Sequence, residues 1–221
     1  MSPTPDPTRR APIPPPPTEP APSWFRDRRV HCLGIGGCGM SGLARMITQL
    51  GARCSGSDQT PSELTEDLRI RGIPVSFDQD RGELPPDLDL VIASAAIPAD
   101  HPERRAAAVR ELPVMSYAEA IGRLQLERTG VSIAGTHGKS TSSAMLCHVL
   151  LTCGYDPSFI VGATCRQIGG GAHVGRPTMP DQSAWAGRPG LLVCEACEFN
   201  RSFHHHRPTL AVIHNIEEDH L

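Results

Sequence analysis

The residues best suited to chemistry lie in the stretch SIAGTHGKSTSSAMLCHVL, residues 132–150. There an apolar run leads into a short glycine loop that ends in Gly138, Lys139 and Ser140. In phosphate-binding loops that end in this way, backbone N–H groups hold the phosphates, the lysine reaches their oxygens and the hydroxyl binds Mg²⁺. The pattern therefore predicts a cradle for a nucleoside triphosphate.

This loop is shorter than the common form G-x-x-x-x-G-K-[ST], whose first glycine would fall at Ile133. The sequence has G-x-x-G-K-S instead, from Gly135 to Ser140. Its context favours phosphate binding, because an apolar strand precedes the loop and a helix with an apolar stripe, over residues 141–151, follows it. An ordinary strand-to-helix turn is the alternative interpretation.

Carboxylates follow two later apolar runs. LLVCEACE ends in Glu195 and Glu198, and IHNIEEDH carries Asn215 and His220 in a polar cluster. A phosphate loop that uses Mg²⁺ needs a carboxylate at the end of a neighbouring strand. Three parallel strands would place Ser140, Glu195 and His220 along one edge of a sheet.

Cysteine spacing raises zinc as an alternative for the same region. Cys194 and Cys197 form a CxxC pair, and three histidines follow at 204–206. Metal-binding CxxC pairs usually come with a second pair at defined spacing, which this sequence lacks. The spacing therefore leaves zinc as a minor alternative.

Another glycine loop, GIGGCG, lies near the start of the chain. It is the first glycine loop in chain order, and residues 135–140 form the second. Gly34, Gly36 and Gly39 fit G-x-G-x-x-G, a loop that lets a backbone approach a pyrophosphate at a helix N-terminus. Asp58 stands where such domains place the acid that binds a ribose. Taken alone, this loop predicts a dinucleotide such as NAD, and a glycine turn that only packs a helix on a sheet is the alternative.

The elements that must position these loops alternate between strand and helix, which predicts parallel sheets with right-handed crossovers. In the first half we expect strands at 29–33, 52–56, 73–76, 89–93 and 113–115, with helices after the first glycine loop and at 62–71, 102–111 and 116–127. In the second half we expect only three central strands, at 131–134, 191–194 and 210–215. Residues 163–189 are rich in glycine and proline and read as loops with room for a short hairpin.

The domain organisation follows from this alternation. Residues 1–23 hold ten of the 22 prolines and read as a disordered tail. Residues 24–127 form a Rossmann-like α/β domain with a parallel sheet. Residues 128–221 form the first part of a P-loop-type α/β domain that binds ATP, which we expect to be truncated and covered on one face only.

Composition excludes some partners. The net charge of −3 gives no reason to expect nucleic acid or an anionic membrane surface. No apolar run approaches the ~18 residues of a membrane span, and no secretory signal is present, so we expect a cytoplasmic protein with reduced thiols.

Taken together, the motifs resemble those of the Mur ligases. VHCLGIGGCGMSGLA is similar to the opening motif of that family, and GSD (residues 56–58) and SAAIP (residues 94–98) are similar to its later uridine-diphosphate loops. AGTHGKS, EACE and NIEEDH resemble its ATP loop and its metal-binding segments. Ser140 stands where threonine is usual, and Cys197 replaces an aspartate. The resemblance therefore implies that CEAC is the end of a strand and not a zinc site. The resemblance runs from about Val30 to the last residue.

The resemblance implies an ADP-forming ligase that uses ATP and Mg²⁺. ATP would phosphorylate the lactyl carboxylate of UDP-N-acetylmuramate, and the amine of L-alanine would attack the acyl phosphate, in peptidoglycan precursor synthesis. It implies catalytic roles for Lys139, Asn215 and His220, and metal binding by Ser140, Glu195 and His220, with Glu198 as a further candidate. The implied ATP-binding residues are Gly135, Thr136, His137, Gly138, Lys139, Ser140 and Thr141, and the implied UDP-sugar-binding residues are Gly34, Gly36, Gly37, Cys38, Gly39, Met40, Ser41, Asp58, Ser94 and Ala95.

Three alternatives stay open at this point. One is the related ligase that recycles whole peptides onto the same sugar nucleotide. Another is an NAD-dependent oxidoreductase, which the first loop and Asp58 alone would allow. The third is a non-catalytic nucleotide-binding module, because the chain ends soon after the third central strand and is expected to be an inactive front half of a ligase.

Overall fold

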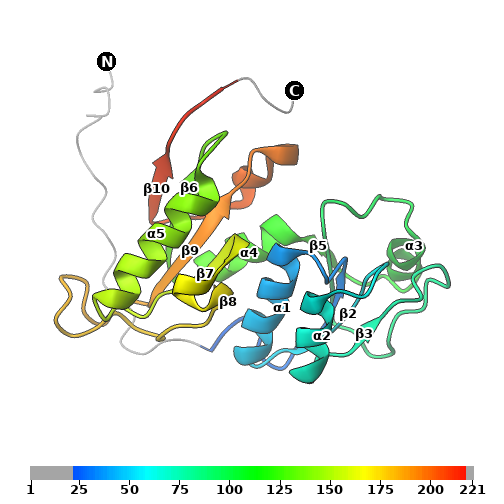
Figure 1. Ribbon diagram of the computed structural model, residues 1–221. Coiled ribbons are helices and arrows are strands. Elements are labelled where there is room, and N and C mark those ends of the chain that lie inside the picture. Colours follow the sequence, from blue (N-terminus) through cyan, green and yellow to red (C-terminus); the bar gives the residue numbers. More distant parts are fainter. Residues whose placement is uncertain (1–21, 218–221) are drawn as a thin grey trace, which may run out of the picture.

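A computed structural model describes residues 22–217 of the chain. The tail predicted at 1–23 lies, except for its last two residues, outside the described residues, and so does His220. Two five-stranded sheets, one from each half of the chain, form the framework (Figure 1). None of the helices in the described part is long and apolar enough to cross a membrane.

The first sheet has the strand order β3-β2-β1-β4-β5, and its neighbouring strands are all parallel. In a doubly wound sheet of this order the direction of winding reverses between β1 and β4, and ligands bind beyond the carboxyl ends of the strands there. The strands are β1 (Arg29–Leu33), β2 (Arg53–Ser57), β3 (Val75–Ser76), β4 (Leu90–Ala93) and β5 (Val114–Ser116).

Helices cover both faces of this sheet, as predicted for a parallel sheet. Core residues of α1, α2 and α4 cluster with one face of β1 and β4, and Ala107 of α3 clusters with the other face. Local signals set their ends, since Ser62 and Ser116 each form a capping box at the start of a helix. The helices are α1 (Cys38–Gln49), α2 (Glu63–Ile70), α3 (Pro102–Val109) and α4 (Tyr117–Gln125).

The second sheet has the order β10-β6-β9-β7-β8, with β10, β6, β9 and β7 parallel and β8 antiparallel to β7. Its strands are β6 (Thr129–Ala134), β7 (Ser158–Cys165), β8 (Gly170–His173), β9 (Leu191–Ala196) and β10 (Leu210–Ile213). Helix α5 (Lys139–Thr152) packs on it, and the short helices η1 (Arg166–Ile168) and η2 (Phe199–His205) follow β7 and β9.

The expectation of only three central strands was wrong. Strand β7 pairs with β9 along Ser158–Ile160 and then turns back as a hairpin with β8. Only its first half is buried, whereas residues 162–164 are exposed. The apolar run is therefore too short to predict a strand, and the pairing depends on β9, more than thirty residues further along the chain.

The expectation that the second sheet is covered on one face only was also wrong for β7, β8 and β9. Helix α5 covers one face, and α1 and α4 from the first half contact the other (Figure 1). The approach of α1 is close, because a Cβ on Gly42 would lie 2.9 Å from the Cβ of Ala172 and 3.3 Å from Cγ2 of Ile160. Edge strand β10 remains open, with Ile213 63% exposed.

The chain enters the first sheet through an aromatic pair that the sequence patterns did not single out. Phe25 is fully buried in the same core as α1 and α4. Trp24 stacks under the guanidinium of Arg28 at 3.9 Å, and its backbone N–H donates to Oε1 of Glu127 at 2.8 Å. The start of the fold is thereby attached to the end of α4.

A buried polar network joins α4, β6 and the end of η2. Gln125 donates through Nε2 to Oγ of Ser132 at 2.9 Å, and its Oε1 accepts from the backbone N–H of Arg207 at 2.6 Å. The Ser132 hydroxyl lies 3.0 Å from Nδ1 of His206. Because Ser132 already accepts from Gln125, its own proton suits an unprotonated Nδ1. Burial lowers the pKa of His206 to about 4.

This histidine predicts a loss of stability in mild acid. The unfolded chain binds the His206 proton at its ordinary pKa near 6.5, whereas the folded chain binds it only near pH 4. Above pH 6.5 His206 is neutral in both the folded and the unfolded chain, so the folded state keeps its full stability. This stability is lost as the pH falls towards 4, because the unfolded chain then binds the proton and the folded chain does not. We expect the free energy of unfolding to fall by about 2 to 3 kcal/mol over this range. Urea unfolding of wild type and His206→Asn at several pH values isolates this contribution, and equal pH profiles for the two proteins would contradict it.

Candidate active site

The second glycine loop connects β6 to α5, as predicted. Gly135 has φ +142° and Gly138 has φ +84°, so both need backbone conformations that favour glycine. Gly138 is the N-cap of α5, and Lys139 is its first residue. The first turn of a 14-residue helix therefore directs its N–H groups into the loop, an arrangement that attracts phosphate.

Lys139 lies folded over this loop. Its Nζ donates to the carbonyl oxygens of Gly135 at 2.6 Å and Thr136 at 3.1 Å. It also contacts both carboxylate oxygens of Glu198, at 3.0 and 2.9 Å, and its side chain is only 14% exposed. Glu198, which the sequence offered as a further metal ligand, is thus the counter-ion of Lys139 in this structure.

Ser140 and Glu195 meet across the β6–β9 pair. The Ser140 hydroxyl donates to Oε2 of Glu195 at 2.9 Å, and the N–H of Gly162 on β7 donates to Oε1 at 2.6 Å. A hydroxyl and a carboxylate held this close, beside the second glycine loop, are hard oxygen donors of the kind that Mg²⁺ takes. The residues present therefore fit a magnesium ion.

The segment after β10 holds the second glycine loop in place. Asn215 accepts through Oδ1 from the N–H of His137 at 3.0 Å, and its backbone oxygen lies 3.4 Å from the N–H of Thr136. The Thr136 hydroxyl accepts from the N–H of Glu217 at 3.1 Å. Thr141, in the first turn of α5, lines a shallow groove with Ser140.

The first glycine loop connects β1 to α1. Gly34 has φ +75°, and the N–H of Gly36 donates to Oδ2 of Asp58 at 2.7 Å. A Cβ on Gly36 would lie 2.8 Å from the same oxygen. Asp58, which the sequence suggested as the acid that binds a ribose, therefore accepts a hydrogen bond from the loop itself.

The remaining residues expected to bind the sugar nucleotide at this loop differ in exposure, since some lie at the surface and others are buried. Gly37 is the N-cap of α1, and Cys38 is exposed at its start. A Cβ on Gly39 would lie 3.0 Å from the ring of Tyr117, which explains the small residue there. Met40 and Ser41 are buried, and the Ser41 hydroxyl donates to the backbone oxygen of Cys38.

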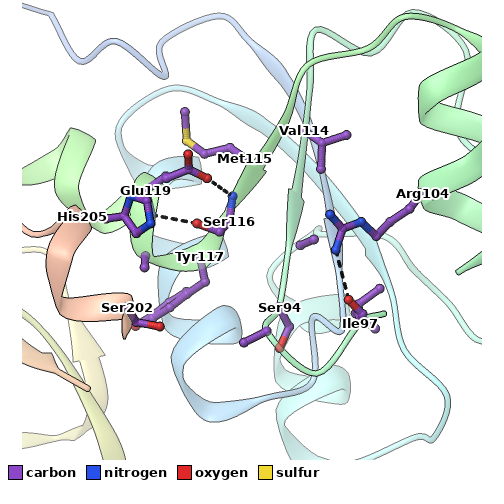
Figure 2. A pocket seen from close by; sticks show the side chains of 13 residues that line it. Ser94, Ile97, Arg104, Val114, Met115, Ser116, Tyr117, Glu119, Ser202 and His205 are labelled. Carbon is purple, nitrogen blue, oxygen red and sulfur yellow. Dashed lines mark hydrogen bonds between the residues drawn. The ribbon is translucent and has the colours of Figure 1, made fainter. Parts of the chain in front are cut away.

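A cavity of about 330 Å³ adjoins this loop at the carboxyl ends of β4 and β5 (Figure 2). Two residues expected at the sugar-nucleotide site, Ser94 and Ala95, line it. Ser94 also lies against the loop, 3.1 Å from the position of a Cβ on Gly34. The cavity lies at the ends of β4 and β5, next to the β1–β4 pair where the winding of the sheet reverses, which is the usual place for a ligand.

Other residues of this cavity were not predicted from the sequence. Arg104 comes from α3, and Ser202 and His205 come from η2 in the second half of the chain. Glu119 accepts from the N–H of Ser116 at 2.7 Å, and this bond holds the pKa of its carboxyl below the usual range. The S-x-x-E spacing of the capping box was the available signal for Ser116 and Glu119.

The zinc alternative finds no support among residues 22–217, where no three His, Cys, Asp or Glu side chains lie together as a metal site would need. Cys194 is buried within β9, and Cys197 follows its end. Burial holds the pKa of the Cys194 thiol well above its usual range.

Comparison with known proteins supports the resemblance that the sequence motifs indicated. The family model described as "Mur ligase family, catalytic domain" matches residues 29–129. A UDP-N-acetylmuramate–L-alanine ligase of Lachnospira eligens is 39% identical over 193 residues, and one of Carboxydothermus hydrogenoformans is 42% identical over 192. Each match covers 87% of this chain and 39% of the relative, so the chain spans about two fifths of the length of these relatives.

Solved structures of ligases share the fold. The UDP-N-acetylmuramate:L-alanyl-gamma-D-glutamyl-meso-diaminopimelate ligase of Neisseria meningitides superposes with a TM-score of 0.76 at 29% identity, covering 88% of this chain and 62% of that one. The UDP-N-acetylmuramate–alanine ligase of Thermotoga maritima gives 0.75 at 28%, covering 87% and 42%. These matches show that the chain carries a Mur ligase family domain, which the family model places at residues 29–129.

Proposed function

We propose that this chain provides the sugar-nucleotide and ATP sites of an ADP-forming ligase that joins L-alanine to UDP-N-acetylmuramate. The observation that carries the proposal is the contact of Ser140 with Glu195 beside the second glycine loop, in a chain that also has the first glycine loop. The curated relatives at 39% and 42% identity bear the name of this activity.

Each residue of the second loop has a defined task in the proposed reaction. The N–H groups at the start of α5 and Nζ of Lys139 would hold the phosphates of ATP and offset the charge that develops during phosphoryl transfer. Ser140 and Glu195 would hold Mg²⁺, which supplies further positive charge when it is bound. Asn215 would fix the loop through His137, which makes it a positioning residue.

The first loop and the adjoining cavity would bind UDP-N-acetylmuramate. Gly34 and Gly36 give the backbone the shape that a diphosphate needs, and Asp58 keeps that shape by accepting from the N–H of Gly36. We accordingly retain 24–127 as the sugar-nucleotide domain and 128–221 as the ATP-binding part. The cytoplasmic location and the metal-binding role of His220 stay predictions from the sequence.

The peptide-recycling ligase is the second candidate, favoured by one observation. The Neisseria ligase, whose name includes a whole peptide, superposes as well as the alanine ligase of Thermotoga does. The higher identity of the curated alanine ligases, and the opening loop GIGGCGM, favour alanine.

Calorimetry on the whole chain tests the sugar-nucleotide site and separates the ligase from the oxidoreductase. We expect UDP-N-acetylmuramate to bind and NAD to bind at least about tenfold more weakly, a difference of 1.4 kcal/mol. The whole chain is needed, because removing the second half would expose the face of α1 that packs on β7 and β8. Tighter binding of NAD would overturn the proposal.

A further inference from the structure

The cavity beside the first glycine loop has walls from both halves of the chain. Ser94 and Ser116 come from the first sheet, and Ser202 and His205 come from η2. Helix η2 is held against α4 at very close range, since a Cβ on Gly122 would overlap the backbone oxygen of His205. This contact holds His205 at the cavity.

The hydrogen-bond donors that line the cavity suit an anion. Figure 2 shows Arg104 on one side of the cavity and His205 on the other, with serine side chains between them. One N–H of Arg104 is used by the backbone oxygen of Ile97 at 3.1 Å, which orients the guanidinium. The carboxylate of Glu119 is engaged by the N–H of Ser116 at the start of α4. A guanidinium and an imidazole that flank hydroxyls are hydrogen-bond donors of the kind that proteins use to bind phosphate and carboxylate oxygens.

Helix η2 also begins directly after the residues of the ATP loop site. Glu195, which meets Ser140, and Glu198, which pairs with Lys139, precede it within the same short segment. The segment of residues 195–205 therefore runs from the phosphate loop to the cavity. A substrate whose one end lies in the cavity and whose reacting end must reach the phosphate loop would pass along it.

We propose that His205 is a substrate-binding residue, contributed by the second half of the chain, that contacts an anionic group of the sugar nucleotide opposite Arg104. The inference rests on the proposed function and adds a residue that no motif indicated. Two groups of the ligand share the required chemistry, namely the diphosphate and the lactyl carboxylate of UDP-N-acetylmuramate.

The test is calorimetry on the whole chain with His205→Ala and, as a matched control, His204→Ala. His204 is its neighbour on η2, is also exposed and does not line the cavity. Loss of a hydrogen bond to an anionic oxygen should weaken the binding of UDP-N-acetylmuramate about tenfold in His205→Ala and leave His204→Ala within about twofold of wild type. Equal affinities for the two variants would overturn the inference.

Three further ligands locate the contact. An effect on UDP as well assigns His205 to the diphosphate, whereas an effect on UDP-N-acetylmuramate but not on UDP-N-acetylglucosamine assigns it to the carboxylate. Neutral uridine should bind equally to wild type and variant, and an equal loss for uridine would overturn the inference. If His205→Ala fails to fold, His205→Gln serves instead, with the same expected results.

The design separates this inference from the proposed function. If wild type does not bind UDP-N-acetylmuramate, the proposed function itself is wrong. If wild type binds and His205→Ala binds equally well, only the role of His205 is wrong.

Discussion

Replacing Lys139 by alanine, in a version of the protein extended to the length of its relatives, is expected to lower ligase turnover by about a hundredfold or more. Lys139 is held at the phosphate loop by two loop carbonyls and by Glu198. Its ammonium therefore lies at the loop that would hold the transferred phosphoryl group. Steady-state rates of ADP release with ATP, UDP-N-acetylmuramate and L-alanine give the measurement.

Binding of the sugar nucleotide provides the control for this variant. The cavity and the first glycine loop do not include Lys139, so the affinity for UDP-N-acetylmuramate should stay within about twofold. A variant that keeps more than about a tenth of the wild-type rate has lost under about 1.4 kcal/mol, which would show that this loop is not the ATP cradle.

Chemical modification gives a second, independent test of ATP binding at Lys139, and it uses the 221-residue chain without extension. Lys139 is its only lysine, so an amine-directed reagent can modify this side chain and, apart from it, only the N-terminal amine. If the loop binds ATP, millimolar MgATP should slow modification of Lys139 and leave the N-terminal amine unaffected. Peptide mass spectrometry distinguishes the two sites, and equal rates with and without MgATP would argue against phosphate contact.

Replacing Phe25 by alanine is expected to cost about 3 to 5 kcal/mol of stability, a large share of the total for a chain of this size. The ring is fully buried in the core that joins α1, α4, β1 and β9. Its removal leaves a cavity that the neighbouring strands and helices cannot fill without moving. Urea unfolding at neutral pH measures the loss.

Two further variants make this result interpretable. Phe25→Leu keeps most of the volume and should cost less than about 1.5 kcal/mol. Phe203→Ala also removes a phenyl ring, but from η2, where Phe203 is 43% exposed. It should lower the free energy of unfolding by less than about 1 kcal/mol. If Phe25→Ala is no more destabilising than Phe203→Ala, the segment before β1 is not part of the core.

Much of the fold could be predicted because its signals are local. The glycine loops, the capping boxes at Ser62 and Ser116 and the apolar runs of β1, β4, β6 and β9 all act within a few residues of where they lie. Such patterns specify the strand–loop–helix units that bind phosphate. The phosphate loop at residues 135–140 therefore lies between a strand and a helix, as its local pattern predicted.

Strand β7 and the covering of the second sheet were missed for the opposite reason. The strand exists because Ser158–Ile160 pairs with β9, and its hairpin is buried because α1 packs against it. Neither partner is close in sequence, and a short run such as FIV gives no periodicity from which to predict a strand.

By itself, then, the sequence determined which residue types could bind phosphate and metal, and in which local units they lie. The tertiary structure decided which of these residues contact one another. Glu195 and Glu198 are three residues apart and equivalent by type, yet the parallel register that pairs Ile133 with Glu195 brings one to Ser140 and leaves the other to Lys139. The place of His205 at the cavity depends on the close approach of η2 to Gly122. Register and packing join residues far apart in the chain, and no local pattern specifies such distances.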